Sequence, residues 1–209
     1  LRRQRQMCIR DSSMTSLLLP KISADFPDFE YNEMKDRANN VLVSFLRAIT
    51  TKDENALSEG SRELKQQLEN HIEMLRAEGR SEHFDQVKLH RTEIYQYRKT
   101  DGKCIITFQT SLECFHYTTD ENSQILEGDR QYKYQTKFNT DLIYVQDVDK
   151  MKNDYDDALA VTCPNCGAPI PMLGAKHCEY CGCAIIELNI HAWAFHHVEE
   201  ITAKSNALK

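Results

Sequence analysis

The first half of the chain carries its apolar residues at helical spacing. Between Phe29 and Thr51 these residues recur every three or four positions and so trace one face of a helix. A second run, which follows a break at Gly60-Ser61 and stops before Gly79, has the same spacing. The pattern predicts two amphipathic helices in series that share a partner surface. The stripe positions are Met34, Ala38, Val41, Leu42, Phe45, Leu46 and Ile49 in the first run and Leu64, Leu68, Ile72 and Leu75 in the second.

The second half of the chain alternates apolar and polar residues, which is the period of β-strands. Asp101-Gly102, between the first two runs, is a strong hairpin signal, and Thr118–Gly128 is expected to be a polar loop. Val87 and Leu89 are out of phase with Ile94, which indicates a bulge in the first strand. The predicted strands are Phe84–Tyr97, Cys104–Cys114, Tyr132–Tyr144 and Ile186–Phe195.

Helices followed by long antiparallel strands predict an α+β fold, in which N-terminal helices pack on one face of a four-stranded antiparallel sheet. This domain is expected to span residues 24–201, with a flexible tail over 202–209. Residues 1–23 are expected to be a linker. The stretch Met14–Asp28 is not expected to be helical, because Pro20 and Pro27 would break a helix.

Two Cys-x-x-Cys pairs, each closed by a glycine, lie ahead of the last predicted strand. Cys163 and Cys166 form the first pair, and Cys178 and Cys181 form the second. Four thiolates from two short hooks match the tetrahedral coordination of structural Zn²⁺. The glycine after each second cysteine permits a positive-φ turn. We therefore predict one zinc ion held by these four residues, in a ribbon over 161–184 inserted before the last strand.

Other interpretations of the cysteines are less favourable. Disulfides or ordinary buried thiols seldom give doublets with this spacing. Cys183 could replace Cys181 as the fourth ligand, and His177 is another substitute, but Cys181 makes the two hooks match. A site closed by four thiolates leaves no open position for a substrate, so the predicted role of the metal is structural and not catalytic.

The remaining cysteines and the N-terminal residues indicate where in the cell the protein is located. Cys104 and Cys114 lie in one predicted strand, roughly 33 Å apart when extended, and cannot bridge each other. A reducing cytosolic compartment fits best, and no apolar run is long enough to span a membrane. Leu1–Ser12 resembles a translated sequencing adapter, so we expect the natural N-terminus to be missing, and a membrane anchor could have been lost with it.

The charge distribution argues against nucleic acid as a partner. The chain has a net charge of −6, but its first twelve residues contain four Arg and one Asp, so the residues from Ser13 onward carry −9. Lys176 is the only Lys or Arg between Val161 and Ile186. Binding to a phosphate backbone depends on clustered basic residues, and we therefore predict no nucleic-acid partner.

With these features placed, the chain resembles the translocase of inner mitochondrial membrane 44-like domain family. It is most similar to bacterial members that carry a zinc ribbon ahead of their last strand. The similarity runs from about Ala24 to Ile201, with a departure at Glu187–His191, where relatives have a shorter polar turn. The residues that carry it are Asp25-Phe26-Pro27-Asp28-Phe29, Gly79-Arg80, Leu126-Glu127-Gly128-Asp129, the Cys163–Gly182 ribbon and Trp193.

The resemblance implies a cone-shaped α+β fold, similar to nuclear transport factor 2-like and cystatin-like proteins. In the mitochondrial relatives this domain sits at a membrane, helps to recruit the chaperone motor for protein import and has affinity for anionic lipid. Bacterial relatives are often tethered by an N-terminal membrane segment. Motor recruitment is not carried over to this chain, because the mitochondrial N-terminal region does not occur in its sequence.

Two other groups of residues resemble metal sites only loosely. His191 and His197 would share one face of a strand while His196 points away, and no carboxylate or cysteine completes a familiar spacing. We therefore expect surface or partly packed histidines. The run Asp147–Asp157 lacks the glycine and terminal glutamate of a calcium loop, so we interpret it as a solvated connector.

The leading functional hypothesis is a non-enzymatic binding or scaffold domain, stabilised by one Zn²⁺, in the cytosol or at the cytoplasmic face of the membrane. Its cavity, or the sheet face without helices, would receive a protein segment, a peptide or a lipid tail. The alternative is a small-molecule enzyme that uses the cone cavity. Cys114, His116, Tyr132 and Tyr134 could line that cavity, and this alternative predicts a buried His116 or acidic side chain with a shifted pKa beside a tyrosine.

Overall fold

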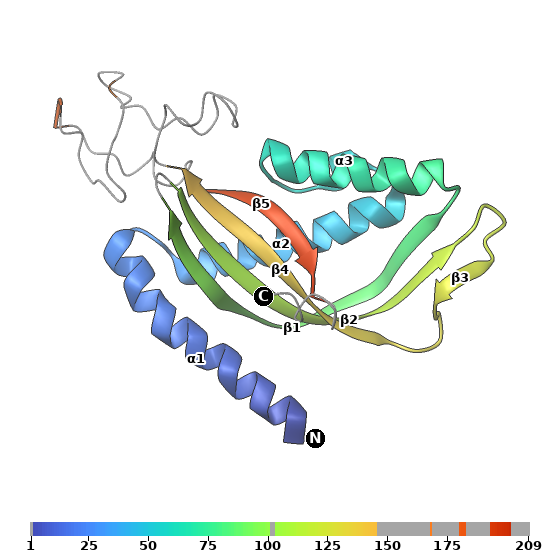
Figure 1. Ribbon diagram of the computed structural model, residues 1–209, viewed down its shortest axis with the longest axis horizontal. Coiled ribbons are helices and arrows are strands. Elements are labelled where there is room, and N and C mark those ends of the chain that lie inside the picture. Colours follow the sequence, from blue (N-terminus) through green and yellow to red (C-terminus); the bar gives the residue numbers. More distant parts are fainter. Residues whose placement is uncertain (1, 101–102, 146–167, 169–179, 183–192, 202–209) are drawn as a thin grey trace. The chain divides into compact units, whose positions relative to one another are not determined.

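The computed structural model describes residues 2–100, 103–145, 168, 180–182 and 193–201. Within these residues it contains three α-helices and an antiparallel sheet of five strands, which confirms the predicted α+β class. The helices are α1 (Arg2–Asp25), α2 (Tyr31–Thr51) and α3 (Arg62–Ala77), with a short 3-10 helix η1 (Glu54–Ala56) between the last two. The strands are β1 (Ser81–Thr100), β2 (Lys103–Thr119), β3 (Ile125–Gly128), β4 (Tyr134–Val145) and β5 (Trp193–Glu200) (Figure 1).

The strands lie in the order β1-β2-β4-β5, and β3 pairs with the end of β2. The chain divides into two compact units, and α2, β1, β2, β4 and β5 contribute residues to both. Unit 1 comprises Leu1–Met34, Glu93–Thr107 and Asp141–Ala194, and unit 2 comprises Lys35–Thr92, Phe108–Thr140 and Phe195–Lys209. The cone-shaped arrangement implied by the family resemblance stays a prediction.

The two predicted amphipathic helices are α2 and α3, and every position of both apolar stripes is buried. Ser61 caps the start of α3, where its side chain accepts a hydrogen bond from the Leu64 N–H at 3.4 Å. Gly79 follows the end of α3 with a φ of 63°. This left-handed conformation ends the helix, as its place in the sequence predicts.

Within unit 2, α2 is tied to the first strand by polar contacts as well as by its apolar face. The Thr92 hydroxyl donates a hydrogen bond to Asn39 Oδ1 at 2.5 Å. Further along, the Phe84 N–H donates to Thr50 Oγ1 at 3.0 Å. These contacts fix the position of α2 along β1, which apolar packing alone would leave free to slide.

The predicted linker is wrong for its larger part, because residues up to Asp25 form helix α1 with Pro20 inside it. Thr15, Leu18 and Ile22 lie at helical spacing and are buried, whereas Pro20 is exposed. Burial of this face outweighs the one backbone hydrogen bond that the proline removes. The helix ends two residues before Pro27, where the restricted backbone favours an extended chain.

The strand prediction needs two corrections. Part of the expected loop Thr118–Gly128 is strand: β2 continues to Thr119, and β3 pairs with it through Tyr117 opposite Gly128. The start of the predicted last strand lies outside the described residues, and β5 runs over Trp193–Glu200. Trp193, Phe195 and Val198 are its buried residues, and the two large aromatic rings remove the most apolar surface from water.

The irregularity expected in the first strand is present in β1. Gln86 has a φ of 51°, which interrupts regular strand geometry. The half-buried Val87 and Leu89 have odd numbers, whereas the buried Thr92 and Ile94 have even numbers. The side chains that point toward the core therefore change from odd-numbered to even-numbered positions between Leu89 and Thr92.

Unit 1 is built around an aromatic cluster that includes Trp193. The Trp193 ring lies 4.8 Å from Phe26, 5.5 Å from Phe29 and 5.2 Å from Tyr144 between centroids. Asp25, next to this cluster in sequence, accepts a hydrogen bond from the Tyr97 hydroxyl at 2.5 Å and pairs with Lys99. The segment Asp25–Phe29 thus joins the end of α1 to the sheet through both aromatic and ionic contacts.

Candidate binding surface

Three of the four predicted zinc ligands, Cys163, Cys166 and Cys178, lie outside the described residues. Cys181 is exposed, and the following Gly182 has a φ of 71°. This is the left-handed turn that we predict after the second cysteine of a metal-binding hook. The described part of the ribbon therefore fits the proposed zinc site, and the site itself stays a prediction.

The other candidate metal sites remain without support in the part of the chain that the structure describes. That part contains no group of three or more His, Cys, Asp or Glu residues placed to hold a metal ion. His196 Nδ1 lies 3.6 Å from Glu63 Oε2, and His197 Nε2 lies 3.8 Å from Glu199 Oε2. These histidines have carboxylate neighbours, while His191, His177 and Cys183 lie outside the described residues.

The four residues proposed to line a cavity have different environments. Cys114 is fully buried, and burial raises the pKa of its thiol to about 11. Tyr132, two residues before β4, is 74% exposed, and Tyr134, at the start of β4, is 41% exposed, so neither belongs to the core. Only His116 and Tyr134 among the four are in ring contact, with centroids 5.6 Å apart. The structure therefore places Cys114 and His116 near Tyr134, while Tyr132 is largely exposed.

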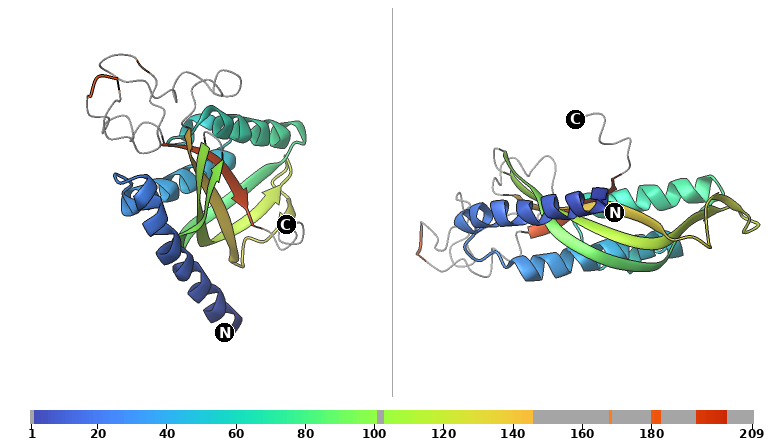
Figure 2. Two further views of the ribbon diagram at one scale, coloured as in Figure 1. Left: turned by 60° about the vertical axis from the view of Figure 1, so that its left-hand side comes forward. Right: turned by 90° about the horizontal axis from the view of Figure 1, so that it is seen from below.

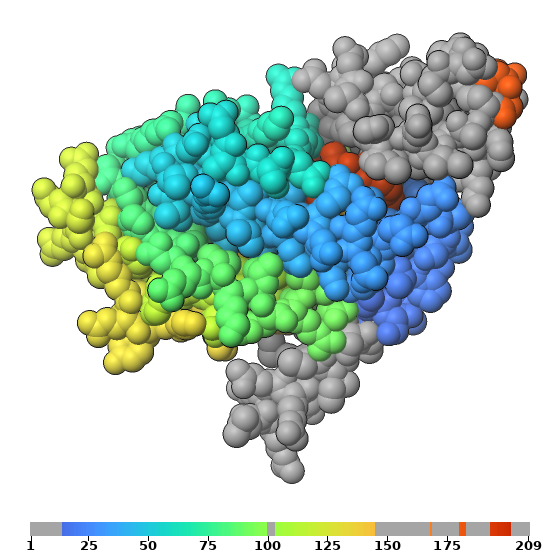
Figure 3. All heavy atoms as spheres, turned by 180° about the vertical axis from the view of Figure 1, so that it is seen from behind, coloured from blue at the N-terminus to red at the C-terminus, as the bar shows by residue number. Residues whose placement is uncertain are grey.

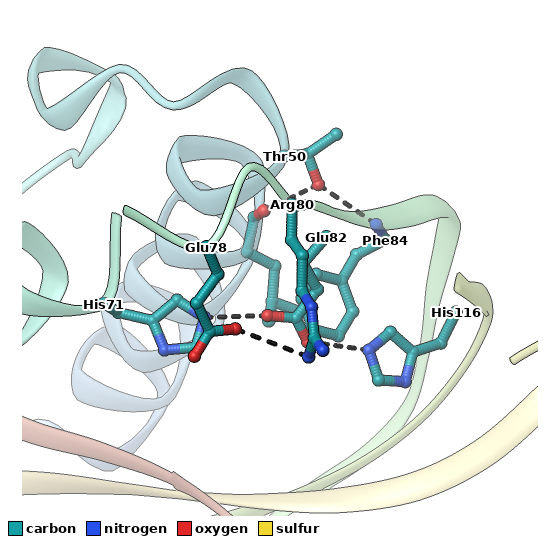
Figure 4. A network of polar contacts seen from close by, with 8 residues as sticks. Thr50, His71, Glu78, Arg80, Glu82, Phe84 and His116 are labelled. Carbon is teal, nitrogen blue, oxygen red and sulfur yellow. Dashed lines mark hydrogen bonds and ion pairs between the residues drawn. The ribbon is translucent and has the colours of Figure 1, made fainter. Parts of the chain in front are cut away.

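His116 belongs to a cluster, with Glu82 and His71, that the sequence did not reveal. The Glu82 carboxylate lies between the two imidazoles: its Oε1 is 2.7 Å from His116 Nε2 and its Oε2 is 2.7 Å from His71 Nε2. His71 comes from α3, Glu82 from the start of β1 and His116 from β2 (Figure 4). We call these three residues the histidine–glutamate cluster. It joins α3 to two strands of unit 2.

The carboxylate of the cluster is strongly held in its ionised form. Burial of Glu82 opposes ionisation, but hydrogen bonds from His116 and His71 and the charges of both rings outweigh it and lower the carboxyl pKa to about 2. An ionised carboxylate only accepts hydrogen bonds, so each ring donates through Nε2–H. The His116 ring is also stacked on Phe84, at 4.4 Å between centroids and 7° between planes.

A glycine turn positions the next segment against His116. Gly128 has a φ of 79°, and a Cβ placed on it would lie 2.2 Å from the His116 carbonyl oxygen. The absence of a side chain lets the Asp129 N–H donate to that oxygen at 3.2 Å. The histidine–glutamate cluster and Gly128 therefore fix the base of the projecting segment between β2 and β4.

This projecting segment gathers exposed apolar side chains. Ile125, Leu126, Tyr132 and Tyr134 are 40%, 46%, 74% and 41% exposed, and we call them the hairpin surface. The right-hand view of Figure 2 shows the β2–β3 hairpin extending beyond the end of α3, and Figure 3 shows it (yellow) projecting from the other described elements of unit 2. A concentration of exposed large apolar side chains in one segment favours an interaction site there.

The edges of the sheet, in contrast, are protected by helix side chains. In unit 2, the amide of Gln67 from α3 donates to the Val198 carbonyl at 2.5 Å and accepts from the Val198 N–H at 3.3 Å. On the opposite edge strand, β1, the Phe84 N–H donates a hydrogen bond to Thr50 Oγ1 in unit 2. In unit 1, the Ile94 N–H donates to Thr15 Oγ1 at 2.9 Å. Addition of a partner strand at these positions would have to displace these bonds.

On the polar face of the sheet, side chains of neighbouring strands pair with one another through hydrogen bonds and ion pairs. In unit 2, Gln109 donates to Asn139 at 3.1 Å and accepts from Lys137 at 2.9 Å. Lys133 pairs with Glu113 at 2.7 Å on the same face. In unit 1, Thr107 donates to Asp141 at 2.6 Å. A lipid tail placed here would remove water from these polar groups without offering them new hydrogen bonds, which is unfavourable.

Sequence reasoning missed Glu82 for a definable reason. The predicted first strand begins at Phe84, whereas β1 begins at Ser81, so Glu82 falls outside the predicted strand. Glu82 lies two residues before Phe84, on the same face of the strand, beside an apolar side chain. That alternation was the available signal. Its histidine partners come from 11 and 34 residues away, and only the fold brings them together.

A comparison of the chain with models of known protein families found no match. A comparison with curated proteins found no match either. No helix among the described residues combines the length and the apolar character that a membrane span requires.

Proposed function

We propose that this chain is a non-enzymatic binding or scaffold domain that receives a partner at the hairpin surface. The observation that carries the proposal is the concentration of four exposed large apolar side chains between Ile125 and Tyr134. Large apolar and aromatic side chains at a projecting edge act as anchors when a partner removes them from water. Helix side chains already bond the edge strands at the positions described above, and polar side chains on the sheet face pair with one another. Both features favour the hairpin surface as the place where a partner binds.

The proposal includes a structural role for zinc. Cys163, Cys166, Cys178 and Cys181 would hold one Zn²⁺ in a closed tetrahedral site and so stabilise the ribbon without acting on a substrate. It also includes the setting that the family resemblance implies: work in the cytoplasm or at the cytoplasmic face of a bacterial membrane, with a protein, a peptide or a lipid as partner. The acidic charge of the chain supports the exclusion of nucleic acid.

The test is co-purification of the tagged full chain from cells, with identification of bound proteins and lipids. A Leu126→Ser/Tyr132→Ser double variant removes apolar area from the hairpin surface, and Tyr95→Ser is the matched control, because Tyr95 is 43% exposed on β1. We expect a partner that is retained by the wild type and the control and lost by the double variant. Recovery of no partner and no lipid, or equal recovery by the double variant, would contradict the proposal.

A second candidate function is a small-molecule enzyme, and one observation favours it. Glu82 is a half-buried carboxylate with a lowered pKa, and it contacts His116, whose ring lies against Tyr134. Such an environment meets part of the expectation for an acid–base site. Against it, a carboxyl with a pKa of about 2 is a weak base near neutral pH.

Nuclear magnetic resonance can separate the two candidates. Ring resonances of His71 and His116 would be followed during a screen of small polar molecules. An enzyme site predicts ligands that shift both rings in the wild type and neither ring in Glu82→Gln. A screen without such ligands would remove the enzyme alternative.

A further inference from the structure

Carboxylates surround the hairpin surface. Asp120, Glu121, Glu127 and Asp129 lie within the ten residues from 120 to 129, and all but Asp120 are exposed. Asp120 and Asp129 each turn one oxygen, Oδ1, toward backbone N–H groups, those of Asn122 and Gln124 and those of Gln131 and Tyr132 respectively. These bonds hold the two charges in place, that of Asp120 in the turn between β2 and β3 and that of Asp129 next to Gly128. We call the four residues the acidic rim.

The basic residues of the same segment are already engaged. The Arg130 guanidinium lies 4.5 Å from the centroid of the Tyr117 ring. Lys133 Nζ lies 2.7 Å from Glu113 Oε1 on the polar face of the sheet. Residues 120–135 contain four acidic and two basic side chains, so the segment keeps a net charge of −2. The charge that surrounds the apolar side chains is therefore predominantly negative.

We propose that the hairpin surface binds a cationic amphipathic segment of a partner protein, with the apolar side of that segment on Leu126 and the two tyrosines and its Lys or Arg residues on the acidic rim. This inference rests on the proposed function and specifies the chemistry of its partner. Tyrosine suits such a site, because its ring supplies apolar area and its hydroxyl and ring face accept cationic groups.

Charge complementarity decides between a cationic segment and the other occupants of an apolar surface. The acidic rim would repel an acidic segment and the head groups of anionic lipids, whereas Lys and Arg would be steered toward it. Exposed carboxylates act mainly on the association rate and on its salt dependence, and the apolar contacts supply the larger part of the affinity. The two contributions can therefore be separated by variants.

The experiment uses the full chain and three probes. The first is a model peptide of Leu and Lys with apolar positions at helical spacing, the second is the same peptide with Glu in place of Lys, and the third is a vesicle of anionic lipid. Fluorescence anisotropy measures the peptides, and co-sedimentation measures the vesicles. A peptide with the composition of the first probe in scrambled order controls for non-specific attraction of Lys to an acidic protein.

We expect the Leu–Lys peptide to bind at least about tenfold more tightly than the scrambled and acidic peptides. Leu126→Ser/Tyr132→Ser should weaken this binding by about tenfold or more, while Tyr95→Ser leaves it unchanged. Glu121→Gln/Glu127→Gln changes neither apolar group and should reduce the salt dependence of the dissociation constant. These side chains are exposed, so the variants should keep the fold, which circular dichroism verifies.

Each other outcome overturns the inference in a distinguishable way. Binding of the acidic peptide or of anionic vesicles that depends on Leu126 and Tyr132 leaves the hairpin surface as the binding site and refutes the cationic partner. Binding of the Leu–Lys peptide that the apolar double variant does not weaken refutes the location, and the proposed function with it. If no probe binds, the cationic partner is refuted, and co-purification decides the proposed function independently.

Discussion

At the scale of single residues, Glu82 and Gly128 determine the geometry beneath the hairpin surface. Glu82 accepts hydrogen bonds from two imidazoles that reach it from α3 and β2. Gly128 permits a backbone contact that any side chain would prevent. One residue acts through charge and the other through the lack of a side chain, so their substitutions should have different signatures.

Replacement of Glu82 by glutamine should destabilise the protein in a pH-dependent manner. The carboxyl pKa is lowered from 4.5 to about 2 in the folded state. The ionised form therefore contributes stability that is complete above about pH 4.5 and is lost as the pH falls toward 2. We expect Glu82→Gln to lower the free energy of unfolding by roughly 1–3 kcal/mol near neutral pH.

Urea unfolding of wild type and Glu82→Gln over a series of pH values measures this effect. The difference between the two proteins should shrink as the pH falls below about 4.5, because the wild-type carboxyl then begins to lose its advantage over the unfolded state. A difference that stays constant from neutral to acidic pH would show that the cluster acts through shape and not through charge.

Replacement of Gly128 by alanine should be more costly than the same change at Gly79. Both glycines have a positive φ, 79° and 63° respectively. A Cβ at Gly128 would meet backbone atoms of His116 and Tyr117 at 2.2 and 2.7 Å, whereas at Gly79 it would meet the end of the flexible Glu121 side chain at 2.9 Å. We expect a loss of roughly 1 kcal/mol for Gly79→Ala and of at least about twice that for Gly128→Ala.

Chemical denaturation gives the two stability changes, and the amide resonance of Asp129 reports the contact with the His116 carbonyl. In Gly128→Ala that amide should lose its protection from exchange with solvent. Equal losses for the two alanine variants would argue that only the left-handed backbone conformation, and not the close approach, requires glycine at residue 128.

At the scale of elements, the sheet relies on helix side chains to protect its edges. The Gln67 amide donates to and accepts from the Val198 backbone, as a neighbouring strand would. The hydroxyl oxygens of Thr15 and Thr50 accept hydrogen bonds from N–H groups of β1. Unpaired edges are sites of unwanted strand addition, and these bonds satisfy them locally. Protection of the sheet edges at these positions therefore depends on a few polar side chains.

Removal of one such side chain should expose the edge of β5. Gln67→Ala deletes both hydrogen bonds to Val198 and should lower the free energy of unfolding by roughly 1–2 kcal/mol. Hydrogen exchange should show faster exchange at the Val198 amide. The control is Gln66→Ala, because the Gln66 amide contacts Glu69 and Asn70 within α3. If both variants behave alike, the Gln67 amide does not protect the edge.

At the scale of the whole molecule, the chain places its candidate functions in different segments. The hairpin surface and the histidine–glutamate cluster belong to unit 2, whereas the four proposed zinc ligands lie between β4 and β5 in the sequence. The ribbon lies ahead of β5 in the sequence, so its folding should be coupled to that strand. The proposed metal would then stabilise the sheet without taking part in partner binding.

Metal analysis tests this arrangement. We expect one zinc per chain in protein prepared without oxygen, and its loss in Cys166→Ser and in Cys178→Ser. Cys183→Ser is the control and should retain the metal, because Cys181 completes the second hook. Loss of zinc should also accelerate amide exchange at Phe195 in β5. Wild-type protein without zinc would refute the site. Zinc lost from Cys183→Ser but retained by Cys181→Ser would identify Cys183 as the fourth ligand in place of Cys181.

The elements that the sequence predicted well are those in which one period runs without interruption. The stripes of α2 and α3 and the alternation from Cys104 to Cys114 appear as a helix pair and as part of β2. Prediction failed where a local signal competed with tertiary burial. Pro20 suggested a linker, but the buried face of α1 keeps the helix intact, and β3 exists because β2 continues far enough to pair with it.

The sequence by itself determined the α+β class, helices α2 and α3 and the proposed cysteine ligands, because periodicity and short spacing are local properties of the chain. Tertiary structure alone decided which polar residues meet. Glu82, His71 and His116 share one site because α3, β1 and β2 converge there. Tyr132 and Tyr134 carry on the alternation of the core, yet they lie beyond its end and remain exposed. Burial depends on what covers a residue, and that is a property of the whole fold.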